Sequence, residues 1–169
     1  MQTLAAGQLV LEPLTVAHAA AMFEVLADAE IYRYLDHPPP PSLEHLRNVY
    51  AKLETRGSPD GSQVWLNWVI RLPGQPPVGY VQATVIAPGS AWVAYVLSSR
   101  QWGRGYAHTA TRAMVEHLAT AYGVGRYLAT VEVENQRSIR LLERLAFRPA
   151  TSHEANGHSL TETERLFVR

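Results

Sequence analysis

The sequence around Gly103 and Gly105 has the composition of an anion-binding turn. An apolar run from Trp92 to Leu97 precedes the two glycines, and apolar residues recur at helical spacing after them, from Ala107 to Tyr122. Because glycine lacks a Cβ atom, successive backbone N–H groups can converge on one point in such a turn. That point lies at the start of a helix, where unpaired amides and the helix dipole favour negative charge. The order strand, glycine turn, helix therefore predicts a site for a phosphate or a pyrophosphate.

Two common phosphate loops do not fit this turn. The dinucleotide-binding fingerprint needs a third glycine, but the residue three positions after Gly105 is His108, and no acidic residue closes the following strand at the expected place. A Walker A loop needs a Lys followed by Ser or Thr, and this segment contains no Lys. A glycine-rich turn that only caps an ordinary helix remains the alternative interpretation.

The turn resembles the acetyl-CoA-binding motif of the GCN5-related N-acetyltransferase (GNAT) superfamily, [Q/R]-x-x-G-x-[G/A]. Two registers fit, one from Arg100 to Gly105 and one from Trp102 to Ala107. We adopt the second, because W-G-x-G-Y-A at the start of the helix is similar to the RimJ/RimL-like branch, in which an aromatic residue commonly takes the first place.

A second motif supports the resemblance. The segment from Asn135 to Phe147, N-Q-R-S-I-R-L-L-E-R-L-A-F, resembles the family pattern N-x-x-S-x-x-x-x-E-K-x-G-F, with Ala146 in place of the usual Gly. Both motifs occur in the family's order, separated by one helix and one strand. At the amino end the match is weaker, because an Arg and an Asp are usual at the places of Glu12 and His18.

The resemblance implies how acetyl-CoA would be held. The pantetheine arm would pair with the open edge of the strand that ends at Leu97, and an N–H near Leu97 would polarise the acetyl carbonyl. Amides of the glycine turn would hold the pyrophosphate, and the Arg104 side chain would add positive charge. The cofactor-binding residues expected on this basis are Tyr95, Val96, Leu97, Trp102, Gly103, Arg104, Gly105, Tyr106, Ala107, Asn135 and Ser138.

The implied reaction is direct attack of an amine on the thioester, which needs one proton removed from nitrogen and one delivered to sulfur. In much of the superfamily a Tyr seven residues after the Asn protonates the sulfur, but that position is Leu142 here. We expect Ser138 to replace it as the acid; the alternative is that its hydroxyl caps the helix or binds CoA. Glu132 is the candidate base. The alternative interpretation is that Glu132 is only a solvated or salt-bridged residue of its strand.

Composition narrows the function classes. Fifteen Lys and Arg balance fifteen Asp and Glu, so we expect no nucleic-acid partner that binds through a general positive surface. The absence of cysteine excludes disulfides and an acyl-cysteine intermediate, and the seven histidines lack metal-ligand spacing, so no metal is expected. The first seven residues do not resemble a signal peptide, and no segment has the length and apolar character of a membrane span. We therefore expect a cytoplasmic protein with no membrane partner.

The periodicity predicts the order strand, two helices, three strands, helix, strand, helix, strand. The three strands form an antiparallel meander with turns at 73–77 and at Pro88-Gly89. This order argues against a βαβ dinucleotide fold and matches the GNAT fold. We predict one α/β (α+β) domain over residues 1–169, with a mixed sheet of about six to seven strands, splayed in the middle and flanked by about four helices. The resemblance is compatible with a monomer or a homodimer.

The function implied is that of an acetyl-CoA-dependent N-acetyltransferase. Its partner would be a primary amine, either a protein N-terminus or a small molecule such as an amino acid, polyamine or aminoglycoside. The alternative is a non-catalytic CoA or acyl-CoA-binding sensor of the same fold. Transfer of a longer acyl group is a third interpretation.

Overall fold

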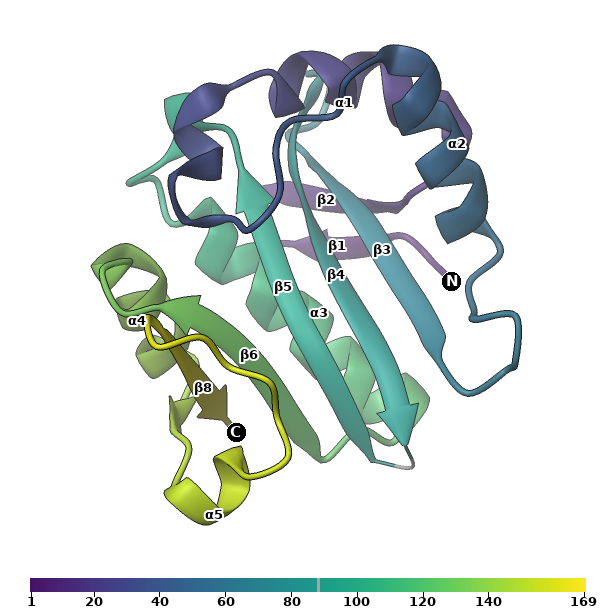
Figure 1. The fold of residues 1–169 in the computed structure, drawn as a ribbon. Helices are drawn as coiled ribbons and strands as arrows, with labels where there is room; N and C mark the ends of the chain where they lie inside the picture. Colours follow the sequence, from purple (N-terminus) through teal and green to yellow (C-terminus); the bar gives the residue numbers. More distant parts are fainter. Residues whose placement is uncertain (88) are drawn as a thin grey trace.

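One mixed β-sheet forms the frame of the protein in the computed structural model, which describes residues 1–87 and 89–169 (Figure 1). Within these residues the sheet has eight strands in the order β1-β2-β3-β4-β5-β6-β8-β7. The strands are β1 (Leu4–Ala6), β2 (Leu9–Pro13), β3 (Val64–Arg71), β4 (Pro77–Ala87), β5 (Ser90–Leu97), β6 (Arg126–Glu132), β7 (Arg148–Pro149) and β8 (Glu164–Val168). Neighbouring strands are antiparallel except β5 and β6, which are parallel, so the predicted mixed sheet is confirmed.

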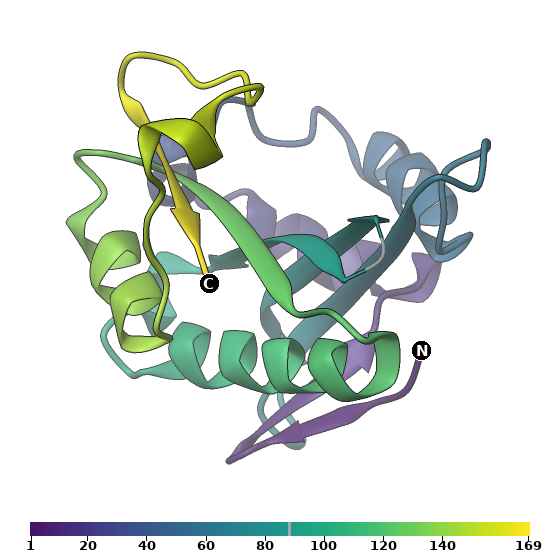
Figure 2. The ribbon, with the colours of Figure 1, turned by 90° about the horizontal axis from the view of Figure 1, so that it is seen from below.

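Helices cover both faces of this sheet. The α-helices are α1 (Ala19–Leu26), α2 (Leu43–Glu54), α3 (Tyr106–Tyr122), α4 (Gln136–Arg144) and the short α5 (Ser152–Ala155), and the 3-10 helices are η1 (Val16–His18), η2 (Ala29–Tyr34) and η3 (Ser99–Gln101). Helix α3 lies along one face, and α1 and α2 lie on the other (Figure 2). Buried Trp68, Met114 and Leu118 belong to the α3 layer, whereas Met22 and Leu46 belong to the opposite layer.

The sheet splays apart in its middle. Strands β5 and β6 are paired only from Ser90↔Arg126 to Trp92↔Leu128. Beyond Trp92 the two strands diverge, and the gap between β5 and β6 opens toward α4 (Figure 1). The splay expected from the family resemblance is therefore present, and it leaves one edge of β5 open from residue 93 to residue 97.

Local sequence signals placed most elements correctly. Ser42 caps α2 by accepting a hydrogen bond from the His45 N–H at 3.0 Å, as its type and position predict. The additional strands β1 and β7 have three and two residues, which is too short for a periodic pattern. Helix α5 lies in the segment 151–159, which the sequence predicts to be a hairpin loop. Pro88, in the predicted second turn of the meander, lies outside the described residues.

The two departures from the family pattern at the amino end form a pair. The Glu12 carboxylate lies 3.3 Å from His18 Nε2 and 3.1 Å from Arg71 Nη1. An acid on the strand and a base on the helix thus exchange the places that the family pattern gives to an Arg and an Asp. The Glu12–His18 contact joins β2 to η1.

Candidate functional site

The splay of the sheet is the floor of a cleft of about 930 Å³, close to the upper end of the range of about 300–1,000 Å³ found for ligand sites. Five elements line it: η2, the open part of β5, the glycine turn with the start of α3, the end of β6, and α4. Each residue singled out from the sequence lines this cleft, namely Tyr95, Val96, Leu97, Trp102, Gly103, Arg104, Gly105, Tyr106, Ala107, Glu132, Asn135 and Ser138. Tertiary structure thus brings the two motifs together.

The open edge of β5 presents backbone groups to the cleft. The Ser98 N–H donates to the Val78 carbonyl on the β4 side at 2.9 Å. Because strand backbone groups alternate in direction, the N–H groups of Tyr95 and Leu97 point the other way, toward the gap before β6. The Leu97 carbonyl accepts the indole N–H of Trp102 at 2.8 Å. The backbone N–H of Leu97 is therefore the group left to face a ligand.

The glycine turn has the backbone conformation that its composition predicts. Gly103 and Gly105 both have φ 78°, a left-handed conformation that favours glycine. Gly105 is the N-cap of α3, and the first i→i−4 hydrogen bond of the helix runs from the Thr109 N–H to the Gly105 carbonyl at 3.0 Å. The amides of residues 106–108 therefore precede the first helical hydrogen bond, at the positive end of the helix dipole.

Positive side chains line the same part of the cleft. The Arg137 guanidinium lies over the Trp102 ring, 4.2 Å from its centroid, and joins α4 to the glycine turn. Arg140 and Arg144 continue along the cleft from α4. Burial, together with the charges of Arg144 and Arg112, lowers the pKa of His108. The region around the start of α3 is therefore positively charged and suited to phosphate groups.

The start of α4 contacts both the Asn135 and the Tyr95 side chains through the backbone of Ser138. Asn135 Oδ1 accepts the Ser138 N–H at 3.1 Å and caps the helix, so the cap is the Asn135 side chain rather than the Ser138 hydroxyl. From β5, the Tyr95 hydroxyl reaches across the splay and donates to the Ser138 carbonyl at 3.4 Å. Burial raises the pKa of Tyr95 to about 12. Its hydroxyl is therefore protonated at neutral pH.

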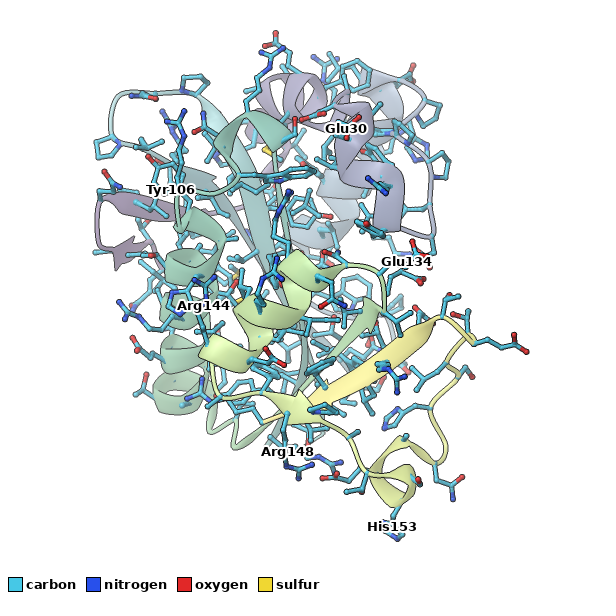
Figure 3. All side chains as sticks on the ribbon, turned by 90° about the vertical axis from the view of Figure 1, so that its left-hand side faces the viewer. Glu30, Tyr106, Glu134, Arg144, Arg148 and His153 are labelled. Carbon is cyan, nitrogen blue, oxygen red and sulfur yellow. The ribbon has the colours of Figure 1, made fainter. Side chains whose placement is uncertain are left out.

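Carboxylates occupy the other side of the cleft. Thr130 and Glu132 share a face of β6 with Leu128, because they are two and four residues further along the strand. Glu132 lines the cleft from this face, as do Glu134 and Glu30 from neighbouring segments. Figure 3 shows Glu30 and Glu134 on the right-hand side of the view and Tyr106 and Arg144 on the left. The cleft is thus positive near α3 and acidic near the end of β6.

Sequence reasoning missed three contributions to this cleft. The arginine stripe of α4, at 137, 140 and 144, was visible as an i, i+3, i+7 pattern, which puts the three side chains on one helix face. The Tyr95 hydroxyl was overlooked because the sequence suggested a role only for its backbone. The wall formed by η2 has no motif that would have revealed it.

Two further features are absent from the described part of the chain. No helix among residues 1–87 and 89–169 combines the length and apolar character needed to cross a membrane. In the same residues, no group of three or more His, Cys, Asp or Glu side chains is placed to hold a metal ion.

Comparison with known proteins identifies the family. The family model described as "Acetyltransferase (GNAT) domain" matches residues 8–148. The chain belongs to the GNAT acetyltransferase family. A relative from Bacillus licheniformis named "Uncharacterized N-acetyltransferase p20" is 25% identical over 150 residues, which are 88% of this chain and 83% of that protein.

Solved structures of acetyltransferases share the fold. RimL, a ribosomal-protein N-acetyltransferase solved in complex with coenzyme A, superposes with a TM-score of 0.82 at 18% identity, covering 99% of this chain and 97% of that one. A GNAT-family acetyltransferase from Bacillus anthracis has a TM-score of 0.78 at 18% identity, covering 99% and 97% of the two chains. The predicted GNAT fold, with the RimJ/RimL-like branch among its neighbours, is confirmed at the level of the fold.

Proposed function

We propose that this GNAT-family chain, acting as one domain, transfers an acetyl group directly from acetyl-CoA to a primary amine. The observation that carries the proposal is the meeting of an open strand edge with an anion-binding turn in one cleft. Strand β5 offers the N–H groups of Tyr95 and Leu97, and the glycine turn offers the amides at the start of α3. An elongated ligand with a peptide-like arm and a pyrophosphate matches both parts.

The residues present fit CoA in shape and in charge. The cleft of about 930 Å³ has room for a large ligand, and α4 lines it with Arg137, Arg140 and Arg144. When bound, acetyl-CoA supplies an activated acyl group as a thioester. A CoA-bound structure of RimL, which shares this fold, supports the assignment.

The chemistry requires two proton movements. A bond forms between the amine nitrogen and the acetyl carbon, the carbon–sulfur bond breaks, one proton leaves nitrogen and one reaches sulfur. We assign the second task to Ser138, and the first to Glu132, either directly or through water. The Leu97 N–H, which faces the gap in the sheet, is the proposed donor to the acetyl carbonyl oxygen.

The acceptor in this proposal is a primary amine of a small molecule or of a protein N-terminus. The GNAT neighbour from Salmonella typhimurium is described as an acetyl transferase that modifies an N-terminal serine of a protein of the 50S ribosomal subunit. Its fold is shared at 18% identity, with a TM-score of 0.79. This likeness supports a protein N-terminus as one candidate acceptor.

Calorimetric titration of acetyl-CoA tests the cofactor assignment. Gly105→Glu places a carboxylate at the turn and should abolish binding through repulsion of the pyrophosphate. Gly74→Glu is the matched control, because Gly74 also has a positive φ of 72°, has nothing within 4 Å of an added Cβ, and lies in the β3–β4 turn, which does not line the cleft. Binding to wild type and Gly74→Glu but not Gly105→Glu is expected. Absence of binding to folded wild type would contradict the proposal.

A second candidate function is a CoA or acyl-CoA sensor without transfer activity. It is favoured by Leu142, which is 1% exposed and occupies the place where much of the family has a catalytic Tyr. Release of CoA thiol that depends on an added amine would exclude the sensor. Tight acetyl-CoA binding with no amine-dependent release over a broad panel would favour it over the enzyme.

A further inference from the structure

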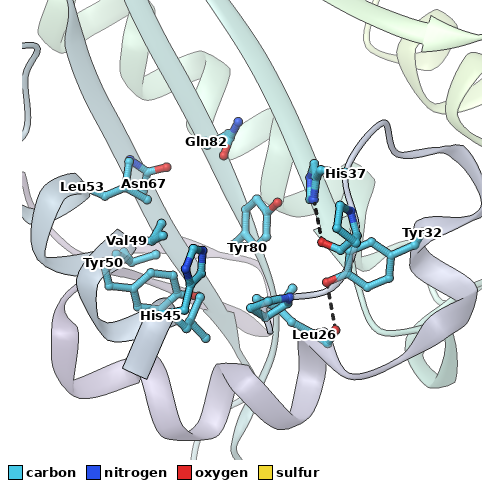
Figure 4. Close-up of a pocket in the computed structure, with 14 residues that line it drawn as sticks. Leu26, Tyr32, His37, His45, Val49, Tyr50, Leu53, Asn67, Tyr80 and Gln82 are labelled. Carbon is cyan, nitrogen blue, oxygen red and sulfur yellow. Dashed lines mark hydrogen bonds between the residues drawn. The ribbon is translucent and has the colours of Figure 1, made fainter. Parts of the chain in front are cut away.

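A second, smaller hollow lies beside the cofactor cleft, on the face of the sheet covered by α1 and α2 (Figure 4). Its volume is about 250 Å³, just below the range of about 300–1,000 Å³ found for small-molecule sites. Its walls come from η2 and the proline-rich segment after it, from α2, and from β3 and β4. The hollow can therefore hold one end of an acceptor, of about the size of a single amino-acid residue.

The register of the sheet places this hollow next to the cofactor cleft. Tyr80 and Gln82 on β4 line the hollow, and their partners on β5 are Val96 and Ala94, which line the cleft. Paired residues on neighbouring strands have side chains on the same face, with the strands about 4.8 Å apart. Helix η2 contributes to both walls, since its Tyr32 lines the hollow and its neighbours line the cleft. The hollow thus opens beside the reacting end of the proposed cofactor site.

The lining of the hollow is mostly apolar, with several polar groups among the apolar side chains. Among the described residues that form it there are tyrosine hydroxyls, imidazoles and the amides of Asn67 and Gln82, but no Asp, Glu, Lys or Arg. An extra charge on an entering molecule would lose its water without gaining a carboxylate, ammonium or guanidinium partner. The chemistry of the wall therefore disfavours a carboxylate or a second ammonium group in the acceptor.

Tyr50 marks a hydrogen-bonding position in the hollow. The side chain is 4% exposed, and its hydroxyl has no hydrogen-bond partner within the described part of the chain. Burial, with Tyr80 and Tyr32 nearby, raises the pKa of Tyr50, so the hydroxyl keeps its proton and can donate. A buried donor without a partner is unfavourable until a ligand supplies an acceptor atom.

We propose that this hollow, defined by Tyr50, Asn67, Tyr80 and Gln82, is the acceptor pocket and that it selects primary amines carried by an uncharged group with a hydrogen-bond acceptor such as an amide carbonyl. The inference rests on the proposed acetyl transfer and names its substrate class. It disfavours polyamines, aminoglycosides and free amino acids. Amino-acid amides and peptide N-termini with a neutral first residue share the favoured chemistry.

Two matched pairs of amines test the selection. Leucinamide is compared with leucine, and n-butylamine with 1,4-diaminobutane, by acetyl transfer from acetyl-CoA to each amine. In each pair we expect kcat/KM to be at least about tenfold higher for the member that lacks the additional carboxylate or ammonium group. Tenfold is the ratio that one unpartnered buried charge produces. Equal or higher kcat/KM for leucine and 1,4-diaminobutane would overturn the inference and leave the proposed acetyl transfer intact.

Tyr50→Phe tests the hydrogen-bonding position. We expect about a tenfold loss of kcat/KM for leucinamide, no change for n-butylamine, which has no acceptor atom, and no loss of thermal stability, because the hydroxyl has no partner in the folded chain. Tyr122→Phe is the matched control, since Tyr122 lies at the end of α3 and lines neither hollow. A drop in melting temperature, or equal losses for both amines, would show a structural role and contradict the inference.

A binding measurement separates the pocket from the enzyme. Calorimetry of leucinamide and leucine with the CoA-loaded protein reports selection without turnover. If leucinamide binds more tightly than leucine but no amine is acetylated, the selectivity of the pocket is supported and the proposed acetyl transfer is overturned. If the two bind equally and amines are acetylated, acetyl transfer is supported and the selectivity is overturned. A leucine-initiated tetrapeptide as a further acceptor distinguishes the sources: a kcat/KM above that of leucinamide indicates a protein N-terminus, and an equal or lower value indicates a small molecule.

Discussion

At the scale of single residues, Tyr95 and Ser138 meet at the start of α4. Ser138 starts α4 with its N–H capped by Asn135, which leaves its hydroxyl free of the capping role. The Tyr95 hydroxyl donates to the Ser138 carbonyl from the opposite side of the splay. Because the pKa of Tyr95 is raised to about 12 by burial, it is a weaker proton donor than an ordinary tyrosine. A serine hydroxyl is no stronger an acid, so the proposal of Ser138 as the acid rests on its place in the family motif, and Tyr95, whose hydroxyl is engaged with the Ser138 carbonyl, is the proposed positioning residue.

Substitution separates these two roles. Ser138→Ala should lower kcat by at least about 100-fold, the smaller end of the range for a general acid, with little change in the Kd of acetyl-CoA. Tyr95→Phe, which removes only the bond to the Ser138 carbonyl, should lower kcat by less than about tenfold. Single-turnover kinetics and calorimetry provide the two measurements. A larger loss of kcat in Tyr95→Phe than in Ser138→Ala would reverse the assignment.

Another residue-scale prediction concerns the end of α4. Ala146 has φ 61°, which confirms that the position usually occupied by Gly in this family has a left-handed backbone. Ala146→Gly should raise the free energy of unfolding by about 1 kcal/mol, because glycine adopts this conformation without strain. Thermal melting should move up by about 2–4 °C for a chain of this length.

The control for that change is Ala119→Gly, at an exposed position within α3. There glycine should lower the free energy of unfolding by about 1 kcal/mol, since the helix favours alanine. Shifts of the same sign in both variants would argue against the backbone explanation for Ala146.

At the scale of elements, the close approach of β4 and β5 sets the position of the open strand edge. A Cβ at Gly79 on β4 would overlap the Val96 carbonyl oxygen and lie 2.8 Å from Leu97 Cα. Glycine therefore lets the end of β5, within the part that is not paired with β6, lie close to β4. The backbone groups proposed to bind the pantetheine arm depend on this contact.

Gly79→Ala should lower the free energy of unfolding by about 1–3 kcal/mol, as expected for overpacking, and should weaken acetyl-CoA binding by moving β5. Gly125→Ala is the control, because a Cβ there would have nothing within 4 Å and the φ of Gly125 is not positive. Its free energy of unfolding should change by less than about 0.5 kcal/mol. Denaturant unfolding and calorimetry measure the two effects, and unchanged binding in Gly79→Ala would separate the strand contact from the cofactor site.

At the scale of the whole molecule, Asp28 joins the proposed acceptor side to the proposed cofactor side. Its carboxylate accepts the Ser99 N–H at 2.7 Å and the Ser98 hydroxyl at 3.3 Å, and also the Glu30 N–H at 3.2 Å. These bonds connect the start of η2, which lines both hollows, to the end of β5. Partial burial alone would raise the pKa of Asp28, but the hydrogen bonds from Ser99 and its neighbours hold it below the ordinary value of 3.8.

The direction of this pKa shift predicts a pH dependence. A carboxyl whose folded-state pKa is lowered contributes stability that is fully present above its unfolded-state pKa and is lost as the pH falls through the lower folded-state value. Asp28→Ala should therefore melt at a lower temperature than wild type from pH 7 down to about pH 5, and the gap should close below about pH 4. Melting curves across this range measure it. A gap that persists at pH 2 would show that the charge is not responsible.

Asp60→Ala is the control for the link between the two sides. Hydrogen bonds from Ser58 and Ser62 lower the pKa of Asp60 to about 2, but they connect residues of one exposed loop only. We expect Asp28→Ala to weaken acetyl-CoA binding and Asp60→Ala to leave it unchanged. Equal affinities for both variants would mean that the Asp28 contact stabilises the fold without positioning the site.

The sequence by itself determined most of the longer helices and strands and which of them carry the family motifs. These properties depend on residues within one or two turns of each other: the period of apolar positions in α3, the cap at Ser42, and the left-handed glycines at 103 and 105. The motif residues proved to line one cleft because the order of elements allows few ways to fold them.

Only the tertiary structure decided the contacts between segments far apart in the chain. The Tyr95 hydroxyl meets residue 138, Arg137 stacks on Trp102, and the proposed acceptor pocket combines η2, α2, β3 and β4. None of these contacts has a local pattern, because each joins side chains from elements that are far apart in the sequence. Sheet register and packing over long sequence separations therefore set the pocket chemistry, whereas local periodicity and backbone conformation set the elements that carry it.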